Sequence, residues 1–178
     1  CYYKNKLYFK KASKVIPVDT IGCGDSFMAG VLSYLYNLNL DNILEEIKKA
    51  NTIAIVVHEN PDGDAIGSAL AMKLALKQLN KESDVIIPEY PSAFSFLPGV
   101  EEIKKESDIQ EYDLAIALDC ASIRLLNGFA KYFDNAKVKV AIDHHSSNTM
   151  YADYNYINQD SPACAQLLLV AFSYFGIE

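Results

Sequence analysis

The pattern of hydrophobic and polar positions divides the chain into short apolar runs that alternate with amphipathic stretches. Four apolar runs are typical of buried strands, and they cover residues 53–57, 85–87, 112–118 and 138–142. A fifth run, 154–157, fits an edge strand. Apolar residues at helical spacing predict helices over 43–51, 64–80, 123–133 and 162–175. Strands alternating with helices predict an α/β fold with a doubly wound, mostly parallel sheet flanked by helices.

The first 38 residues do not follow this alternation, and their pattern predicts a short strand–loop–helix appendage. Strand-like pieces are followed by a glycine loop, Gly22 to Gly24, and then by an apolar helical stripe. Exposed backbone N–H groups at a helix N-terminus attract anions, so Gly22 and Gly24 are candidate anion-binding residues. The Asn- and Asp-rich stretch 37–42 is the predicted seam, where Asp41 or Asn42 would cap the next helix.

Composition narrows the classes of function. The chain has 178 residues, enough for one ordinary domain, and a net charge of −7 without a long basic run. That balance argues against binding to long or duplex nucleic acid through its backbone. Four cysteines without CxxC spacing predict free thiols in a reducing cytosol. No apolar run reaches the length of a membrane span, and the start lacks an apolar signal core, so a cytoplasmic protein is expected.

Three of the predicted strands end on acidic or imidazole side chains. These residues are His58, Asp62 and Asp64 after the first strand, Asp119 after the third, and Asp143, His144 and His145 after the fourth. Each group alone has a structural explanation: a helix cap, a common NPDG turn, or a solvated histidine pair. Together they include every histidine of the chain. Parallel strands end at one edge of a sheet, so these side chains can converge there.

Mixed nitrogen and oxygen ligands suit divalent Mn, Zn or Fe better than Ca. Two metal ions that share a carboxylate, roughly 3.5–4 Å apart, can clamp a phosphate and activate a water molecule. The constellation therefore predicts a site for two divalent metal ions. Mn²⁺ is the expected ion, with Mg²⁺, Fe²⁺ or Co²⁺ as alternatives.

The strings HENPDGDAIGS, ALDCAS and the triplet DHH occur in this order, and they resemble the DHH phosphoesterase family. The resemblance covers roughly residues 40–178 and is strongest to the bacterial oligoribonuclease and pAp-phosphatase type. It implies hydrolysis of short oligoribonucleotides or of 3′-phosphoadenosine 5′-phosphate (pAp). It also implies that residues 39–178 form the N-terminal DHH domain. The C-terminal substrate-binding lobe and a further Asp ligand would be missing, which would impair activity.

The resemblance assigns the metal ligands. His58 and Asp62 would bind one ion, Asp64 and His144 the other, and Asp119 would bridge the two. An alternative is a non-catalytic metal- or nucleotide-binding module.

The resemblance also gives roles to the remaining two residues of the triplet. Asp143 would orient the imidazoles from behind, and His145 would face the substrate phosphate. Asp119, His144 and His145 would thus form the catalytic set. An apolar face left without its lobe would favour self-association, so a homo-oligomer is a further expectation.

Residues 18–32, VDTIGCGDSFMAGVL, resemble the C-terminal signature of ribokinase-like (PfkB) sugar kinases. The resemblance implies that residues 1–38 are a kinase-like fragment in which Gly22 and Gly24 hold a phosphoryl anion and Asp25 is the base. The sugar-binding part of that family has no counterpart in the chain. The favoured interpretation is therefore a helix and a glycine turn without kinase activity.

Overall fold

The computed structural model describes residues 2–3, 6–7 and 39–177. Contacts divide the chain into two compact units, Cys1–Tyr34 and Leu35–Glu178. In the first unit, β1 (Tyr2–Tyr3) pairs antiparallel with β2 (Lys6–Leu7). Gly22, Gly24 and Asp25 lie outside the described residues. The anion-binding and kinase assignments therefore stay predictions, as does the division of domains at residue 38.

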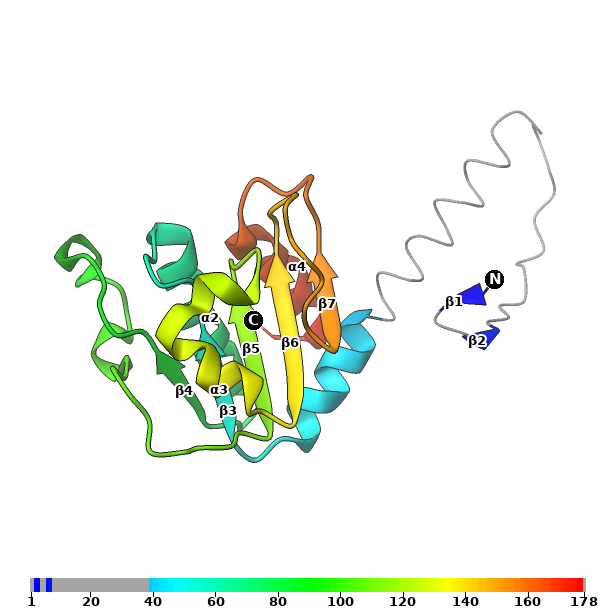
Figure 1. Ribbon diagram of the computed structural model, residues 1–178, viewed down its shortest axis with the longest axis horizontal. Helices are drawn as coiled ribbons and strands as arrows, with labels where there is room; N and C mark the ends of the chain where they lie inside the picture. The colour runs from blue at the N-terminus through cyan, green and yellow to red at the C-terminus, as the bar shows by residue number, and fades with distance from the viewer. Residues whose placement is uncertain (1, 4–5, 8–38, 178) are drawn as a thin grey trace. The chain divides into compact units, whose positions relative to one another are not determined.

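The second unit is built on a five-stranded sheet in which every pairing is parallel. Its strands are β3 (Ile53–Val56), β4 (Ser83–Ile86), β5 (Leu114–Leu118), β6 (Val138–Asp143) and β7 (Tyr154–Ile157). The strand order is β4-β3-β5-β6-β7, with β7 at an edge as expected (Figure 1). The prediction of a doubly wound parallel α/β fold is confirmed. The order reverses between β3 and β5, and such switch points commonly bind ligands at the carboxyl ends of the strands.

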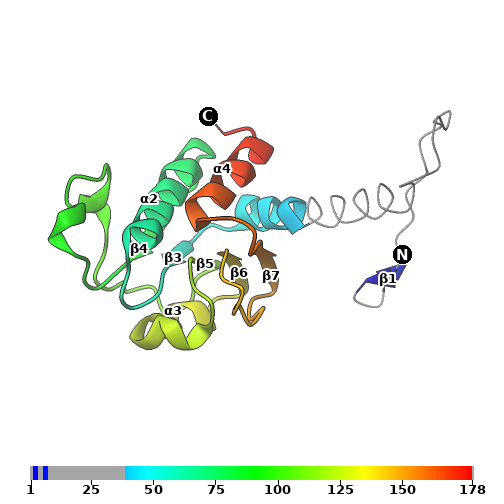
Figure 2. The same cartoon turned by 90° about the horizontal axis from the view of Figure 1, so that it is seen from above.

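Helices cover both faces of this sheet (Figure 2). One face carries helical residues 39–49, α2 (Gly63–Gln78) and α4 (Cys164–Phe175), and the other carries η3 (Ile123–Phe129) and α3 (Ala130–Asp134). Two short 3₁₀ turns, η1 (Ser92–Phe94) and η2 (Val100–Glu102), lie between β4 and β5. None of the helices in the described part of the chain has both the length and the apolar character needed to cross a membrane.

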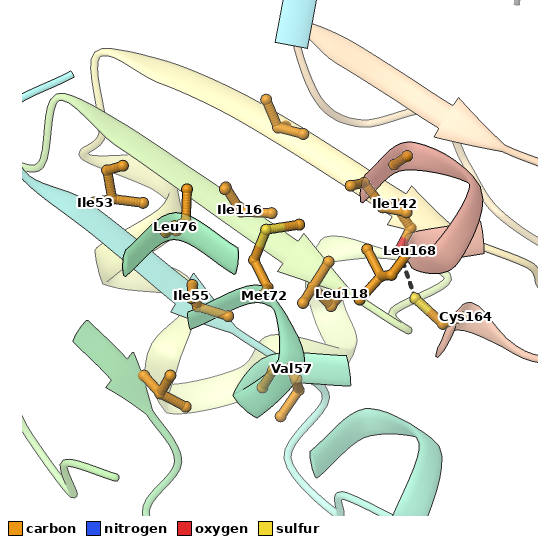
Figure 3. Packing of buried hydrophobic residues seen from close by; sticks show 14 of the residues in the cluster. Ile53, Ile55, Val57, Met72, Leu76, Ile116, Leu118, Ile142, Cys164 and Leu168 are labelled. Carbon is orange, nitrogen blue, oxygen red and sulfur yellow. Dashed lines mark hydrogen bonds between the residues drawn. The ribbon is translucent and has the colours of Figure 1, made fainter. Parts of the chain in front are cut away.

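Successive side chains of each central strand alternate between two cores. In β3, Ile53 and Ile55 pack towards α2 and α4, whereas Ala54 and Val56 pack towards α3. Figure 3 shows side chains of α2, such as Met72, lying over those of β5. Because both faces are covered, β3 and β5 are buried along their whole length. This explains why they read as unbroken apolar runs in the sequence.

Two local predictions were wrong. Residues 123–133 do not form one helix, because Asn127 has a positive φ of 44° and separates the 3₁₀ segment η3 from α3. Its side chain donates a hydrogen bond to Glu59, and the Glu59 N–H donates to the Leu125 carbonyl at 2.8 Å. The break therefore joins the loops that follow β3 and β5. Neither Asp41 nor Asn42 is a helix cap, since residues 39–49 are already helical. Asp41 instead accepts a hydrogen bond from the Tyr174 hydroxyl at 2.6 Å.

Asp113 ties together the starts of β3, β5 and β6, and we expect its contribution to stability to depend on pH. Its carboxylate accepts hydrogen bonds from the Lys137 ammonium at 2.9 Å and from the N–H groups of Asn51 and Thr52 at 2.9 and 3.2 Å. The Lys137 bond, followed by that of Asn51, lowers the pKa of Asp113 from 3.8 to about 2. A lowered pKa means that ionised Asp113 stabilises the fold above about pH 4, and that this stabilisation is lost as the pH falls towards 2.

Replacement of Asp113 with Asn should therefore lower the free energy of unfolding by about 1 kcal/mol at neutral pH. Urea unfolding at pH 7 and at pH 2.5 measures the difference between variant and wild type, which should narrow at the lower pH. The exposed Asp134 offers a matched Asp134→Asn control with little effect at either pH. A difference that stays constant over this range would contradict the assignment.

Candidate metal centre

The candidate site lies at the carboxyl edge of the sheet, around the switch point between β3 and β5. Its side chains come from three strand ends and the first turn of α2: His58, Asp62, Asp64, Asp119, Asp143, His144 and His145. The parallel arrangement brings them together, because all three strands point towards the same edge.

Two clusters of potential ligands share Asp119. In each of them the ligand atoms lie within 4.8 Å of one another; one holds His58, Asp62 and Asp119, and the other Asp119, His144 and His145. Asp119 Oδ2 faces His58 Nε2 at 3.9 Å. Asp119 Oδ1 faces His144 Nε2 at 3.4 Å and His145 Nδ1 at 3.7 Å. The two oxygens of one carboxylate thus face different clusters.

The surroundings of Asp119 fit a bound cation. Its side chain is only 3% exposed, and Oδ1 is buried without a hydrogen-bond partner among the described residues. Burial, and then the nearby Asp64 carboxylate, raise the pKa of Asp119 to about 6. A buried carboxylate oxygen without a donor is costly. A divalent cation would supply the missing partner, and the clusters offer the imidazole and carboxylate ligands that such ions prefer.

Asp62 caps the helix that follows it. Its Oδ1 accepts hydrogen bonds from the N–H groups of Asp64 at 2.9 Å and Ala65 at 3.0 Å. Its Oδ2 accepts none from the described residues, so one oxygen stays available to a ligand. Asp62 is therefore both the N-cap of α2 and a member of the His58 cluster.

Asp64 has a structural role in addition to the one that the resemblance implies. Its carboxylate accepts hydrogen bonds from the first two N–H groups of α4, those of Cys164 at 2.7 Å and Ala165 at 3.0 Å. The residue at the N-cap of α4 is Ala163, which has no side chain for this purpose. Asp64 Oδ2 also lies 3.8 Å from His144 Nε2, although Asp64 belongs to neither cluster. Its role as a metal ligand stays a prediction, whereas its capping of α4 is observed.

Backbone and carboxylate partners orient the two imidazoles. His144 Nδ1 lies 3.1 Å from the Ser161 carbonyl oxygen, which can only accept, so Nδ1 donates to Ser161 and Nε2 is the ring nitrogen that faces Asp119. His145 Nδ1 lies 2.7 Å from Asp143 Oδ1. Burial alone would lower the pKa of His145, but the bond to Asp143 and the neighbouring carboxylates outweigh it and raise the pKa.

Asp143 is completely buried and holds this part of the site in place. Its Oδ1 also accepts the backbone N–H of His144 at 2.9 Å, and its Oδ2 accepts the Asn148 amide at 2.7 Å. The structure places Asp143 against the ring of His145, while the ring of His144 is held by Ser161. Sequence reasoning missed both Asn148 and Ser161. Ser161 acts through its carbonyl, which every residue possesses, so no residue type could have marked it.

Comparison with known proteins identifies the family. The family model described as "DHH family, N-terminal domain" matches residues 52–175. The bifunctional oligoribonuclease and PAP phosphatase NrnA of Thermus thermophilus is 30% identical over an alignment of 139 residues that covers 76% of this chain and 41% of that protein. The probable NrnA of Streptococcus mutans is 25% identical over 130 residues, or 71% of this chain and 40% of that protein. The chain thus spans about two fifths of the length of these curated relatives.

A solved structure shares the fold. The exopolyphosphatase-related protein from Bacteroides fragilis aligns with a TM-score of 0.71 and 25% sequence identity, over 78% of this chain and 45% of that one. The family match does not reach residues 1–38, where the kinase-like prediction rests. It covers most of the chain and includes all the strand-end motifs that form the two clusters, and the chain therefore belongs to the DHH family.

Proposed function

We propose that this chain forms the metal-binding part of a phosphoesterase that acts on short oligoribonucleotides or on pAp. The proposal rests on the position of Asp119: its two carboxylate oxygens face separate clusters of potential metal ligands. Sites with two divalent ions occur in phosphatases and nucleases, where the ions clamp the phosphate and activate the attacking water. The substrate class rests on the names of the relatives, an oligoribonuclease and PAP phosphatase.

Five residues would act as metal ligands. His58 and Asp62 would hold one ion, His144 and Asp64 would hold the other, and Asp119 would join them. When bound, the ions would supply Lewis-acid activation of a water molecule and would offset the charge of the phosphate. We favour Mn²⁺, with Mg²⁺, Fe²⁺ or Co²⁺ as alternatives.

His145 is the member of the set that is best placed to meet a substrate. Its side chain is 43% exposed, compared with 22% for His58 and His144. Asp143 Oδ1 accepts a hydrogen bond from Nδ1–H, so the ring is held in one orientation with Nε2 directed away from that contact. When Nε2 carries a proton, it can donate a hydrogen bond to a phosphate oxygen.

The test is metal-dependent hydrolysis by the full chain. With Mn²⁺ present, pAp should release inorganic phosphate and the dinucleotide pApA should release AMP, both followed by chromatography. A chelator should stop both reactions, and added Mn²⁺ should restore them. If neither substrate is cleaved although Mn²⁺ binds, the chain is a binding module and the proposed activity is wrong.

Metal removal should also lower stability. An ion that binds only the folded chain stabilises it by about 2.7 kcal/mol when its concentration is a hundred times the dissociation constant. Thermal unfolding with Mn²⁺, and again after chelation, measures this difference. Ca²⁺ serves as the matched control, because a site rich in imidazole disfavours it. Equal melting temperatures with Mn²⁺ and with chelator would contradict the metal centre itself.

A further inference from the structure

A polar pocket of about 390 Å³ lies next to the metal centre and shares His145 with it. Its walls come from the loop after β6, the carboxyl end of β7 and the start of helix 39–49. The ends of β6 and β7 lie side by side at the same edge of the sheet (Figure 1). The volume falls in the range of small-molecule sites, roughly 300–1,000 Å³. Two other cavities that are lined by described residues share no residue with the metal-site clusters.

The lining of this pocket favours a ligand without a strong charge. Among the described residues, the lining contains no lysine or arginine, and the side chains that can carry a charge near neutral pH are His145 and Asp160. Most of the remaining lining consists of amides and a hydroxyl, which donate and accept hydrogen bonds: Asn39, Ser146, Asn148, Asn155, Asn158 and Gln159. A phosphate would find no positive side chain here apart from His145 at the border with the metal centre. The Met150 side chain, 56% exposed, offers an apolar surface at the same pocket.

Hydrogen bonds hold the pocket in a fixed position relative to the metal centre. Asn148 donates to Asp143 Oδ2 at 2.7 Å, and its own Oδ1 accepts the Met150 N–H at 2.8 Å. On the opposite wall, the Asn158 N–H donates to the Asp143 carbonyl at 3.1 Å. Asp143 also holds His145, so both walls and the shared imidazole depend on one buried residue. A ligand in this pocket would therefore lie at a defined place beside the centre.

We propose that this pocket is the nucleoside subsite, which takes the ribose and base of a nucleotide whose phosphate lies at the metal centre. The inference rests on the proposed function and extends it. The amides of Asn158 and Gln159 match the hydrogen-bonding edges of a base and the hydroxyls of ribose, and the thioether of Met150 covers a face of the ring. The lack of lysine and arginine places the nucleoside here rather than a second phosphate.

Adenosine is a direct probe, because it has no phosphate and does not need the metal. Added to the full chain without metal, it should shift the backbone amide NMR signals of Ser146, Asn158 and Gln159. Gln159 is exposed, so Gln159→Trp should fill the pocket without disturbing the core, and it should abolish these shifts. The matched control is Ser147→Trp, an exposed neighbour outside the lining, which should keep them. No shifts in the wild type, or shifts only at the other cavities, would overturn the subsite.

Hydrolysis separates this inference from the proposed function. Gln159→Trp should raise the KM for pApA at least tenfold and change the hydrolysis of bis(p-nitrophenyl) phosphate, an ester without a nucleoside, less than twofold. Equal effects on both substrates would contradict a nucleoside subsite. If the wild type cleaves neither ester, the proposed function fails, and the adenosine titration still decides whether the pocket binds a nucleoside.

Discussion

Replacement of Asp119 with Asn should abolish metal-dependent hydrolysis and leave the fold intact. Asp119 is the one residue common to both clusters, and an amide replaces one of its two potential ligand oxygens with a nitrogen that cannot bind a cation. The loss of turnover should be on the order of 10²–10³-fold or more, as for the removal of a group that stabilises charge in a transition state. The stabilisation by Mn²⁺ should disappear together with turnover. Rates with pApA and melting temperatures with and without Mn²⁺ measure both effects.

The same variant has a built-in control for folding. Asp119 has a φ of 53°, a left-handed conformation that Asn adopts as readily as Asp. Burial raises the pKa of Asp119 to about 6, so ionising Asp119 costs more free energy in the folded, metal-free chain than in the unfolded chain. The neutral Asn should therefore unfold at the same urea concentration as the metal-free wild type, or at a higher one. Equal turnover in Asp119→Asn and wild type would remove Asp119 from the mechanism.

Replacement of Asp64 with Ala should loosen the start of α4. The variant leaves the N–H groups of Cys164 and Ala165 without an acceptor, and the loss of a capping side chain costs about 1–2 kcal/mol. The free energy of unfolding should fall by this amount in urea titrations of the metal-free chain. Hydrogen exchange of these two amides should become faster, while that of amides in the middle of α2 should change only through the global loss of stability.

Two further variants make this result specific. Asp64→Asn keeps one acceptor oxygen and should show an intermediate loss. Asp134→Ala removes an exposed carboxylate of α3 that caps no helix, and it should leave both the unfolding midpoint and the exchange of Cys164 and Ala165 unchanged. Unchanged exchange of these amides in Asp64→Ala would show that the carboxylate does not hold α4 in solution.

Several features of the site could be predicted from the sequence. Asp119 follows an apolar strand, and the triplet that ends in His145 follows another, so their convergence required only that the strands be parallel and ordered as observed. The sequence could not predict that Asp62 caps α2 whereas Asp64 caps α4. Both are acidic residues in one turn, but only Asp64 meets the N-terminus of α4, which is 100 residues away in the chain.

The sequence by itself determined the strands, the parallel α/β architecture and the set of potential ligands, because apolar periodicity and the polarity of strand ends are local properties. It misjudged residues 123–133, since apolar spacing does not register the left-handed turn at Asn127. Only the tertiary structure decided which oxygen of Asp119 faces which histidine, that Asp64 caps α4, and that the Ser161 carbonyl orients His144. These contacts join distant segments through single atoms, and the distances between such atoms arise only when the whole sheet and its helices are packed.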